Sequence, residues 1–124
     1  MNNFITEDML ALDFAARHEH RLRYVSKSSK VMAQRWLILN EATGDWENDV
    51  TLQVLALVRA LCREAAAQCE DRKQAWRIGS AETISSVERL ARCDARLAAT
   101  PEMVMGKSQT KVVPKRKKGK APQP

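Results

Sequence analysis

The sequence predicts a mainly helical α+β domain: a helical platform that carries a small β hairpin or ribbon, followed by a disordered basic tail. Residues 51–100 hold the sustained helical period of apolar side chains. Short apolar runs at 22–26 and 34–39 have the length and spacing of strands. With 124 residues the chain is one domain at most, which we place at 1–105, with the tail at 106–124.

The first two helices are predicted from their start signals and their apolar spacing. Thr6 can cap a helix over residues 7–20, where acidic residues in the first turn favour the positive end of the helix dipole. Either Asp49 or Thr51 caps the longest helix, which runs to about Cys69. The side chains expected to face the core from these helices are Leu10, Phe14, Val54, Leu57, Val58, Leu61, Cys62, Ala65 and Cys69.

Two further helices complete the platform. A short one holds Trp76 and Ile78 and ends at Gly79. Ser80 caps the last helix, over residues 81–92. We expect its inward face to bury Ile84, Val87, Leu90 and Ala91, with Leu97 pointing back to the core and Pro101 closing the folded region. Because aromatic residues make up only 5% of the chain, the three tryptophans are expected to be large core anchors.

The two strand-like runs form the ribbon. The segment 40–45 between the second run and Trp46 is rich in turn residues, and Gly44 can adopt a positive φ there. The result is a hairpin or a three-stranded ribbon that carries Tyr24, Trp36 and Trp46. Such ribbons are marginal alone, so this one must pack against the helices.

The net charge of +6 is concentrated in the tail. Seven of the 21 basic residues lie there without any acid, whereas the rest of the chain has 14 basic and 15 acidic residues. Cations that neutralise phosphates bind nucleic acid without sequence preference, although a solvated tail without function is an equal alternative. The candidate nucleic-acid-binding residues are Lys107, Lys111, Lys115, Arg116, Lys117, Lys118 and Lys120.

The sequence names no catalytic, metal or cofactor site. His18 and His20 are two apart, so on a helix they point away from each other and cannot hold one ion. The cysteines read as free thiols, with Cys62 and Cys69 in the core. Gly106 lies in a fragment that resembles a phosphate-binding loop but lacks its first glycine and the following helix. Trp36 and Trp46 could stack on bases, but core anchoring is the stronger interpretation.

The expected location is the cytoplasm. No apolar run reaches the roughly 18 residues that a membrane span needs, and the first ten residues lack the basic start and apolar stretch of a signal peptide. We expect no membrane partner and no small-molecule substrate. The candidate partners are DNA and a second copy of the chain.

A series of phrases resembles a known family. They occur in order as LRYV from Leu22, RWL from Arg35, Trp46 after a glycine, VLALVRALCREAAA, an I-x-S-A-x-T phrase from Ile78, and VERLARCDARLAAT. This succession is similar to the poxvirus-NTPase N-terminal-like domain that precedes the superfamily 3 helicase motor in satellite-phage-type DNA primase–helicases. The resemblance covers about Leu10 to Glu102. It implies a role in phage or plasmid DNA replication, with other replication proteins as candidate partners.

The chain departs from that family in its catalytic parts. The Walker A and B motifs and a primase-type acidic centre are absent from this sequence, and the segment between Tyr24 and Trp36 is longer and more polar than the family's compact hairpin. We therefore expect a non-catalytic accessory domain or fragment, a truncated gene product or prophage remnant, that acts by protein packing and weak DNA contact. One alternative is a stand-alone nucleic-acid-binding or regulatory protein that uses its basic tail. Another is part of a split helicase or primase that a separate ATPase subunit completes.

Overall fold

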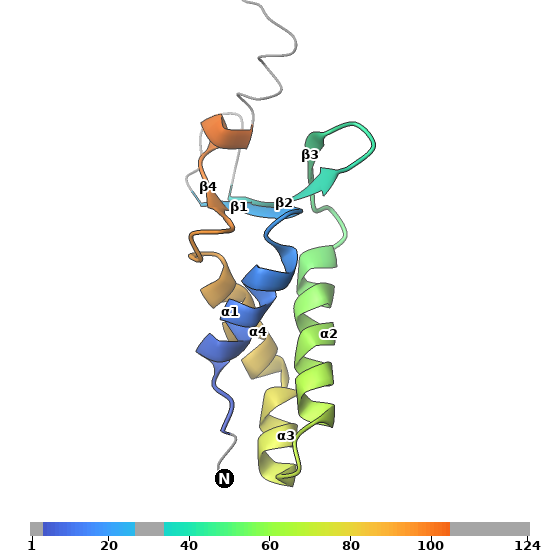
Figure 1. Ribbon diagram of the computed structural model, residues 1–124, viewed down its shortest axis with the longest axis vertical. Coiled ribbons are helices and arrows are strands. Elements are labelled where there is room, and N and C mark those ends of the chain that lie inside the picture. The colour runs from blue at the N-terminus through green and yellow to red at the C-terminus, as the bar shows by residue number, and fades with distance from the viewer. Residues whose placement is uncertain (1–3, 27–33, 105–124) are drawn as a thin grey trace, which may run out of the picture.

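The computed structural model describes residues 4–26 and 34–104, and it shows a small sheet lying across one end of a group of helices (Figure 1). The predicted α+β class, mainly helical with a small β ribbon, is confirmed. The predicted disorder of the tail falls outside the described residues. The elements are α1 (Glu7–His18), β1 (Leu22–Val25), β2 (Arg35–Asn40), β3 (Asp45–Asn48), α2 (Gln53–Ala67), α3 (Arg72–Ile78), α4 (Ala81–Ala91) and β4 (Ala98–Ala99).

Side-chain caps begin α1 and α4 where the sequence predicts them. Thr6 accepts a hydrogen bond from the Met9 backbone N–H at 3.1 Å, and Ser80 caps α4 in the same way. The start of α2 differs from the prediction, because Leu52 occupies its N-cap position in place of Asp49 or Thr51. Asp49 still bonds to the first turn of α2, since its carboxylate accepts from the N–H groups of Gln53 and Val54 at 2.7 and 2.8 Å. The predicted ends are too long by one or two residues: α1 stops at His18, α2 at Ala67 and α4 at Ala91.

The sheet has four strands in the order β3-β2-β1-β4. β1 pairs antiparallel with β2, which sets Tyr24 opposite Trp36, and β2 and β3 form the predicted hairpin. The hairpin turn contains Gly44 with a φ of 80°, as its sequence requires. The fourth strand, β4, is a parallel partner of β1 that the sequence did not indicate.

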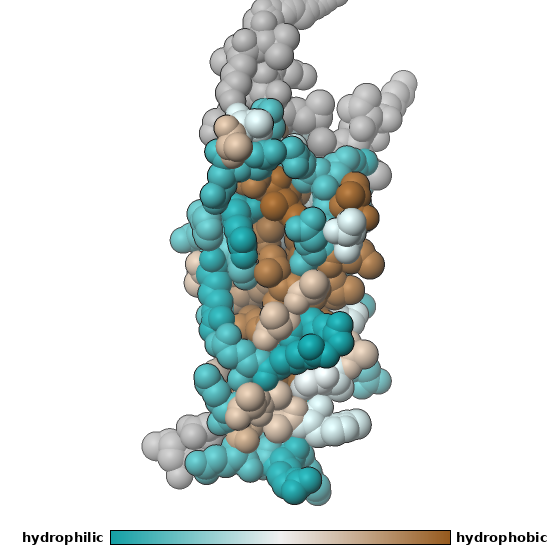
Figure 2. Space-filling view, turned by 90° about the vertical axis from the view of Figure 1, so that its right-hand side faces the viewer, coloured by the Kyte–Doolittle hydropathy of each residue, from teal (hydrophilic) through white to brown (hydrophobic). Residues whose placement is uncertain are grey.

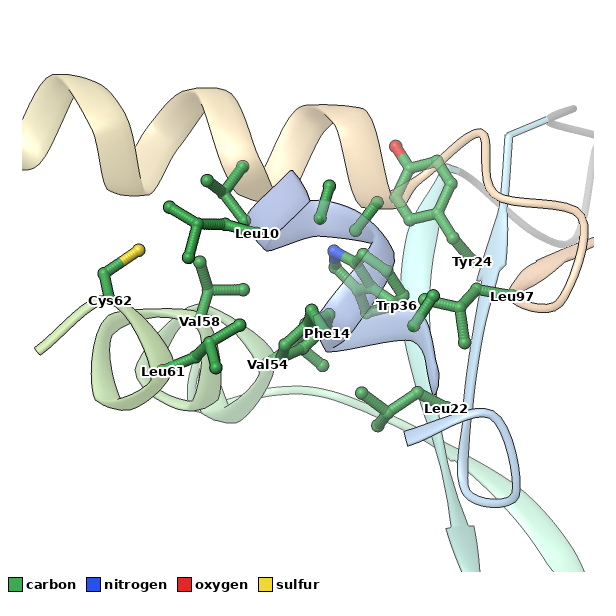
Figure 3. Packing of buried hydrophobic residues seen from close by; sticks show 14 of the residues in the cluster. Leu10, Phe14, Leu22, Tyr24, Trp36, Val54, Val58, Leu61, Cys62 and Leu97 are labelled. Carbon is green, nitrogen blue, oxygen red and sulfur yellow. The ribbon is translucent and has the colours of Figure 1, made fainter. Parts of the chain in front are cut away.

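The core fills the space between α1, α2, α4 and the sheet (Figure 3). Phe14 lies at its centre, with Leu10 from the same helix and Leu22 from the start of β1. α2 contributes the face predicted for it; Val54, Val58, Leu61 and Cys62 are buried, and Leu57, Ala65 and Cys69 pack partly buried against them. The apolar period of the long helix was therefore a correct guide to its inward face.

For two apolar side chains, the prediction that they lie in the core is wrong. Leu90 is exposed, because α4 is rotated so that Thr83, Val87, Glu88 and Ala91 face inward. Trp76 is 79% exposed and anchors nothing, whereas Ile78 beside it is fully buried. Residues two apart on a helix point in nearly opposite directions, so burying Ile78 turns Trp76 outward.

The folded part continues past Pro101. A helical turn over residues 101–104 follows β4 and buries Pro101 and Val104. Val104 packs with Val25, Leu37 and Ala99 in a second, smaller cluster. This cluster gives the small sheet apolar contacts separate from the main core, so Pro101 is not the end of the fold.

Candidate nucleic-acid interface

The seven tail cations proposed from the sequence lie outside the described residues, so the structure places none of them. They are Lys107, Lys111, Lys115, Arg116, Lys117, Lys118 and Lys120. The described part of the chain holds a different basic surface, on α3. It joins an exposed aromatic ring to several cations, which is the combination that single-stranded nucleic acid recognition uses.

Trp76 is the centre of this surface. Its side chain projects from α3 into solvent, and Arg72 and Lys73 lie one turn earlier on the same helix. The three residues, together with Arg77, line a shallow surface depression. Arg72 and Lys73 make no ion pair with the acidic side chains that the structure describes. Their charges are therefore open to an incoming anion.

Arg77 connects this depression to the start of the chain. Its Nη2 donates to the Ile5 carbonyl at 2.6 Å, and its guanidinium lies 5.1 Å from the centre of the Phe4 ring. Phe4 is itself exposed, so a second aromatic ring accompanies the cations. We name the set Phe4, Arg72, Lys73, Trp76 and Arg77 the α3 surface.

The helix that carries the α3 surface is fixed at both ends. The Asp71 carboxylate caps it by accepting from the Lys73 and Gln74 N–H groups at 2.9 and 3.2 Å. This use of Asp71 as a cap ties its charge to the helix start. At the other end Gly79 donates to the Ala75 carbonyl, and Ile78 inserts into the core. Trp76 is therefore presented on a packed helix.

The other two tryptophans are integrated into the fold. Trp36 is buried, and its Nε1–H donates to the Glu88 carboxylate at 2.5 Å. Trp46 is half-buried against the second cluster, with the Arg23 guanidinium 5.1 Å from its ring centre. Core anchoring is confirmed for Trp36, and neither ring offers the open face that Trp76 has.

Glu88 connects α4 to the sheet through hydrogen bonds of its buried carboxylate. It accepts from Arg92 Nε and Nη2 at 2.8 and 3.0 Å, in addition to the bond from Trp36. Arg92 also stacks 4.9 Å from the centre of the Tyr24 ring, and Tyr24 meets Trp36 edge to face at 5.1 Å. The hydrogen bonds to Glu88 raise the pKa of Arg92, so its guanidinium stays charged.

The histidines and cysteines have structural surroundings. His18 Nδ1 accepts from the Arg21 guanidinium at 3.1 and 3.2 Å, and its ring lies 4.6 Å from that of Phe14. The cysteines are free thiols: Cys62 is buried, Cys69 half-buried and Cys93 exposed. Within residues 4–26 and 34–104, no three His, Cys, Asp or Glu side chains gather as metal ligands do.

No protein-family model, curated protein or solved structure matches this chain. In the described segments, no helix is both long and apolar enough to cross a membrane.

Proposed function

We propose that this chain is a non-catalytic accessory domain of a phage or plasmid replication primase–helicase in the cytoplasm, and that it contacts single-stranded DNA through the α3 surface. The observation that carries the DNA contact is the 79% exposure of Trp76 beside Arg72 and Lys73, two cations that form no ion pair within residues 4–26 and 34–104. Exposing so large an apolar ring to water is unfavourable unless a partner covers it. The placement in replication is supported by the sequence resemblance.

Stacking explains why such a surface suits single strands. A base in a duplex already stacks on its neighbours, whereas an unpaired base offers a free face to an indole ring. Stacking on one aromatic residue contributes roughly 1–3 kcal/mol per base, and flanking cations hold the phosphates. The lysine-rich tail adds contacts to phosphates that need no defined geometry.

The direct test measures binding of a fluorescein-labelled oligothymidine to the full chain by anisotropy. Trp76→Ala is expected to weaken binding about 5- to 150-fold, the equivalent of one lost stacking contact. Trp76→Phe should recover much of the affinity. Met103→Ala is the matched control, because Met103 is also exposed but lies in the helical turn over residues 101–104, outside the α3 surface.

Deleting residues 107–124 separates the leading proposal from the stand-alone alternative. If the tail alone binds DNA, the deletion abolishes binding and Trp76→Ala changes nothing, which overturns the proposed role of α3. If α3 contributes, the shortened chain keeps a weaker binding that Trp76→Ala removes. The salt dependence should fall with the deletion, because fewer counterions are released.

The split-enzyme alternative makes a different prediction. If an ATPase subunit encoded beside this chain completes an enzyme, mixing the two should raise phosphate release from ATP above that of the ATPase alone. An unchanged rate, with binding of the two proteins shown by calorimetry, supports the accessory role.

A further inference from the structure

A groove lies between α2 and α4. Leu52, Leu55, Ala56 and Ile84 form part of its apolar lining, Gly79 and Ala81 lie at its α3 end, and the space within it is about 670 Å³. Figure 2 views the side of the molecule that carries α2 and β3, and shows hydrophobic surface between hydrophilic borders there. We call this feature the α2–α4 groove.

The border of the groove is positive. Arg59 and Arg63 lie one turn apart on α2 and line it, and neither pairs with an acidic side chain in the part of the chain that the structure covers. Glu88 also lines the groove, but its carboxylate is already bound by Arg92 and Trp36. Like charges repel, so the lysine-rich tail of this chain is a poor occupant. An amphipathic helix with acidic flanks fits.

Leu52, which lines the groove, adds an independent observation. It is a leucine with a φ of 62°, in the left-handed region that side chains with a Cβ rarely adopt, and it is 67% exposed. The Asp49 cap holds the following N–H groups and so fixes this conformation. Strain of this kind persists where the surroundings impose it, and it is frequent at binding sites.

The outer face of α1 has the complementary character. Met9 and Leu12 are 51% and 50% exposed on this helix, while Leu10 and Phe14 on its other side fill the core. Asp8 lies beside them and makes no ion pair with the basic side chains of the described residues. This apolar stripe with its acidic flank is complementary to the apolar groove with its arginine border.

We propose that the α2–α4 groove binds the outer face of α1 from a second copy of this chain. One such contact covers both exposed apolar surfaces and brings the acidic Asp8 side toward Arg59 and Arg63. The contact is head to tail, because the groove and α1 are different surfaces. One copy of the pair therefore keeps a free α1 and the other keeps a free groove, so the assembly grows into a ring or an open chain.

Sedimentation velocity of the full chain, without DNA, tests this proposal. The wild type is expected to associate as its concentration rises. Leu55→Asp in the groove and Leu12→Asp on α1 should each abolish association, while Met103→Asp, on an exposed residue outside both surfaces, leaves it unchanged. Replacing both Arg59 and Arg63 by Glu should weaken association about tenfold or more, because like charges then face each other.

Mixing the two surface variants gives the sharpest outcome. The Leu55→Asp chain has an intact α1, and the Leu12→Asp chain has an intact groove. Their equimolar mixture should form a 1:1 dimer that cannot extend, although each is monomeric alone. A wild type that stays monomeric at every concentration, association insensitive to these substitutions, or a mixture that stays monomeric would overturn the proposal. Circular dichroism of each variant checks that it is folded.

Discussion

Removing the Glu88 carboxylate should destabilise the fold, because this side chain connects α4 to the sheet. Glu88 is the acceptor for Trp36 from β2 and for Arg92 from its own helix. Its side chain is only 10% exposed, whereas that of Arg92 is 39% exposed. Losing the contact with Trp36 and losing the contact with Arg92 should therefore lower the free energy of unfolding by different amounts.

The larger cost of Glu88→Ala comes from Trp36. Its Nε1–H would be left buried without an acceptor, which costs about 1–3 kcal/mol. Arg92 can turn toward water when its partner is removed, so the lost ion pair contributes about 1 kcal/mol or less. We expect Glu88→Ala to lower the free energy of unfolding by about 2–4 kcal/mol. Glu88→Gln keeps an acceptor for Trp36 and should cost about 1 kcal/mol.

Urea denaturation followed by far-UV circular dichroism measures these values. Ser85→Ala, one turn earlier on α4 and exposed, is the control and should change stability by less than about 0.5 kcal/mol. If Glu88→Ala lowers the free energy of unfolding no more than Ser85→Ala does, the argument that the Trp36 hydrogen bond holds α4 to the sheet is refuted. Equal losses for Glu88→Ala and Glu88→Gln would show instead that the charge carries the effect.

Three further outcomes follow from the structure. Leu52→Gly should raise the free energy of unfolding by about 0.5–1 kcal/mol in urea titrations, because glycine relieves the positive φ. Burial and the neighbouring Arg21 lower the pKa of His18 below its ordinary 6.5. The stability that neutral His18 gives is therefore complete above pH 6.5 and is lost as the pH falls through the lower folded pKa; His18→Gln should flatten the stability–pH curve in that window. Burial raises the pKa of the Cys62 thiol to about 11, so Ellman's reagent at pH 8 should modify exposed Cys93 quickly and Cys62 only on unfolding. Equal rates for the two thiols in the folded protein would contradict the burial of Cys62.

The starts of the helices could be predicted because the interactions that fix them are local. Thr6 and Ser80 each accept from an N–H group three residues ahead, so the sequence alone carries the signal. The helix ends were less predictable, since no comparable side chain marks them. The hairpin at Gly44 belongs to the predictable class for the same reason.

The features that sequence reasoning missed depend on distant contacts. β4 consists of two alanines, whose pattern gives no strand signal, and it exists because Leu97 accepts from Tyr24 and Ala98 pairs with that residue. Leu90 was placed in the core by its character, yet α4 turns Glu88 inward because Trp36 needs an acceptor there. Both outcomes arise between segments more than 50 residues apart.

The exposure of Trp76 could have been predicted from the sequence. The spacing between Trp76 and Ile78 excludes burying both on one helix, and the cations at Arg72 and Lys73 mark the side that faces water. The six tail lysines and one arginine were chosen by charge alone, and they remain a sequence-based prediction. The α3 surface adds an aromatic ring on an ordered helix, so it offers both stacking and charge.

If both proposals hold, self-association through the groove should strengthen the binding of long DNA strands by the α3 surface. Trp76 on α3 is not among the residues of the groove or of the outer face of α1, so association leaves it free. Copies joined head to tail would then present several Trp76 rings to one strand, and the effective concentration of the later contacts rises. Leu55→Asp should therefore weaken binding to a long oligothymidine while leaving binding to an oligonucleotide too short for two copies unchanged. Equal losses on both lengths would show that Leu55 acts on the fold or on DNA directly, because assembly can affect only a strand long enough to hold more than one copy.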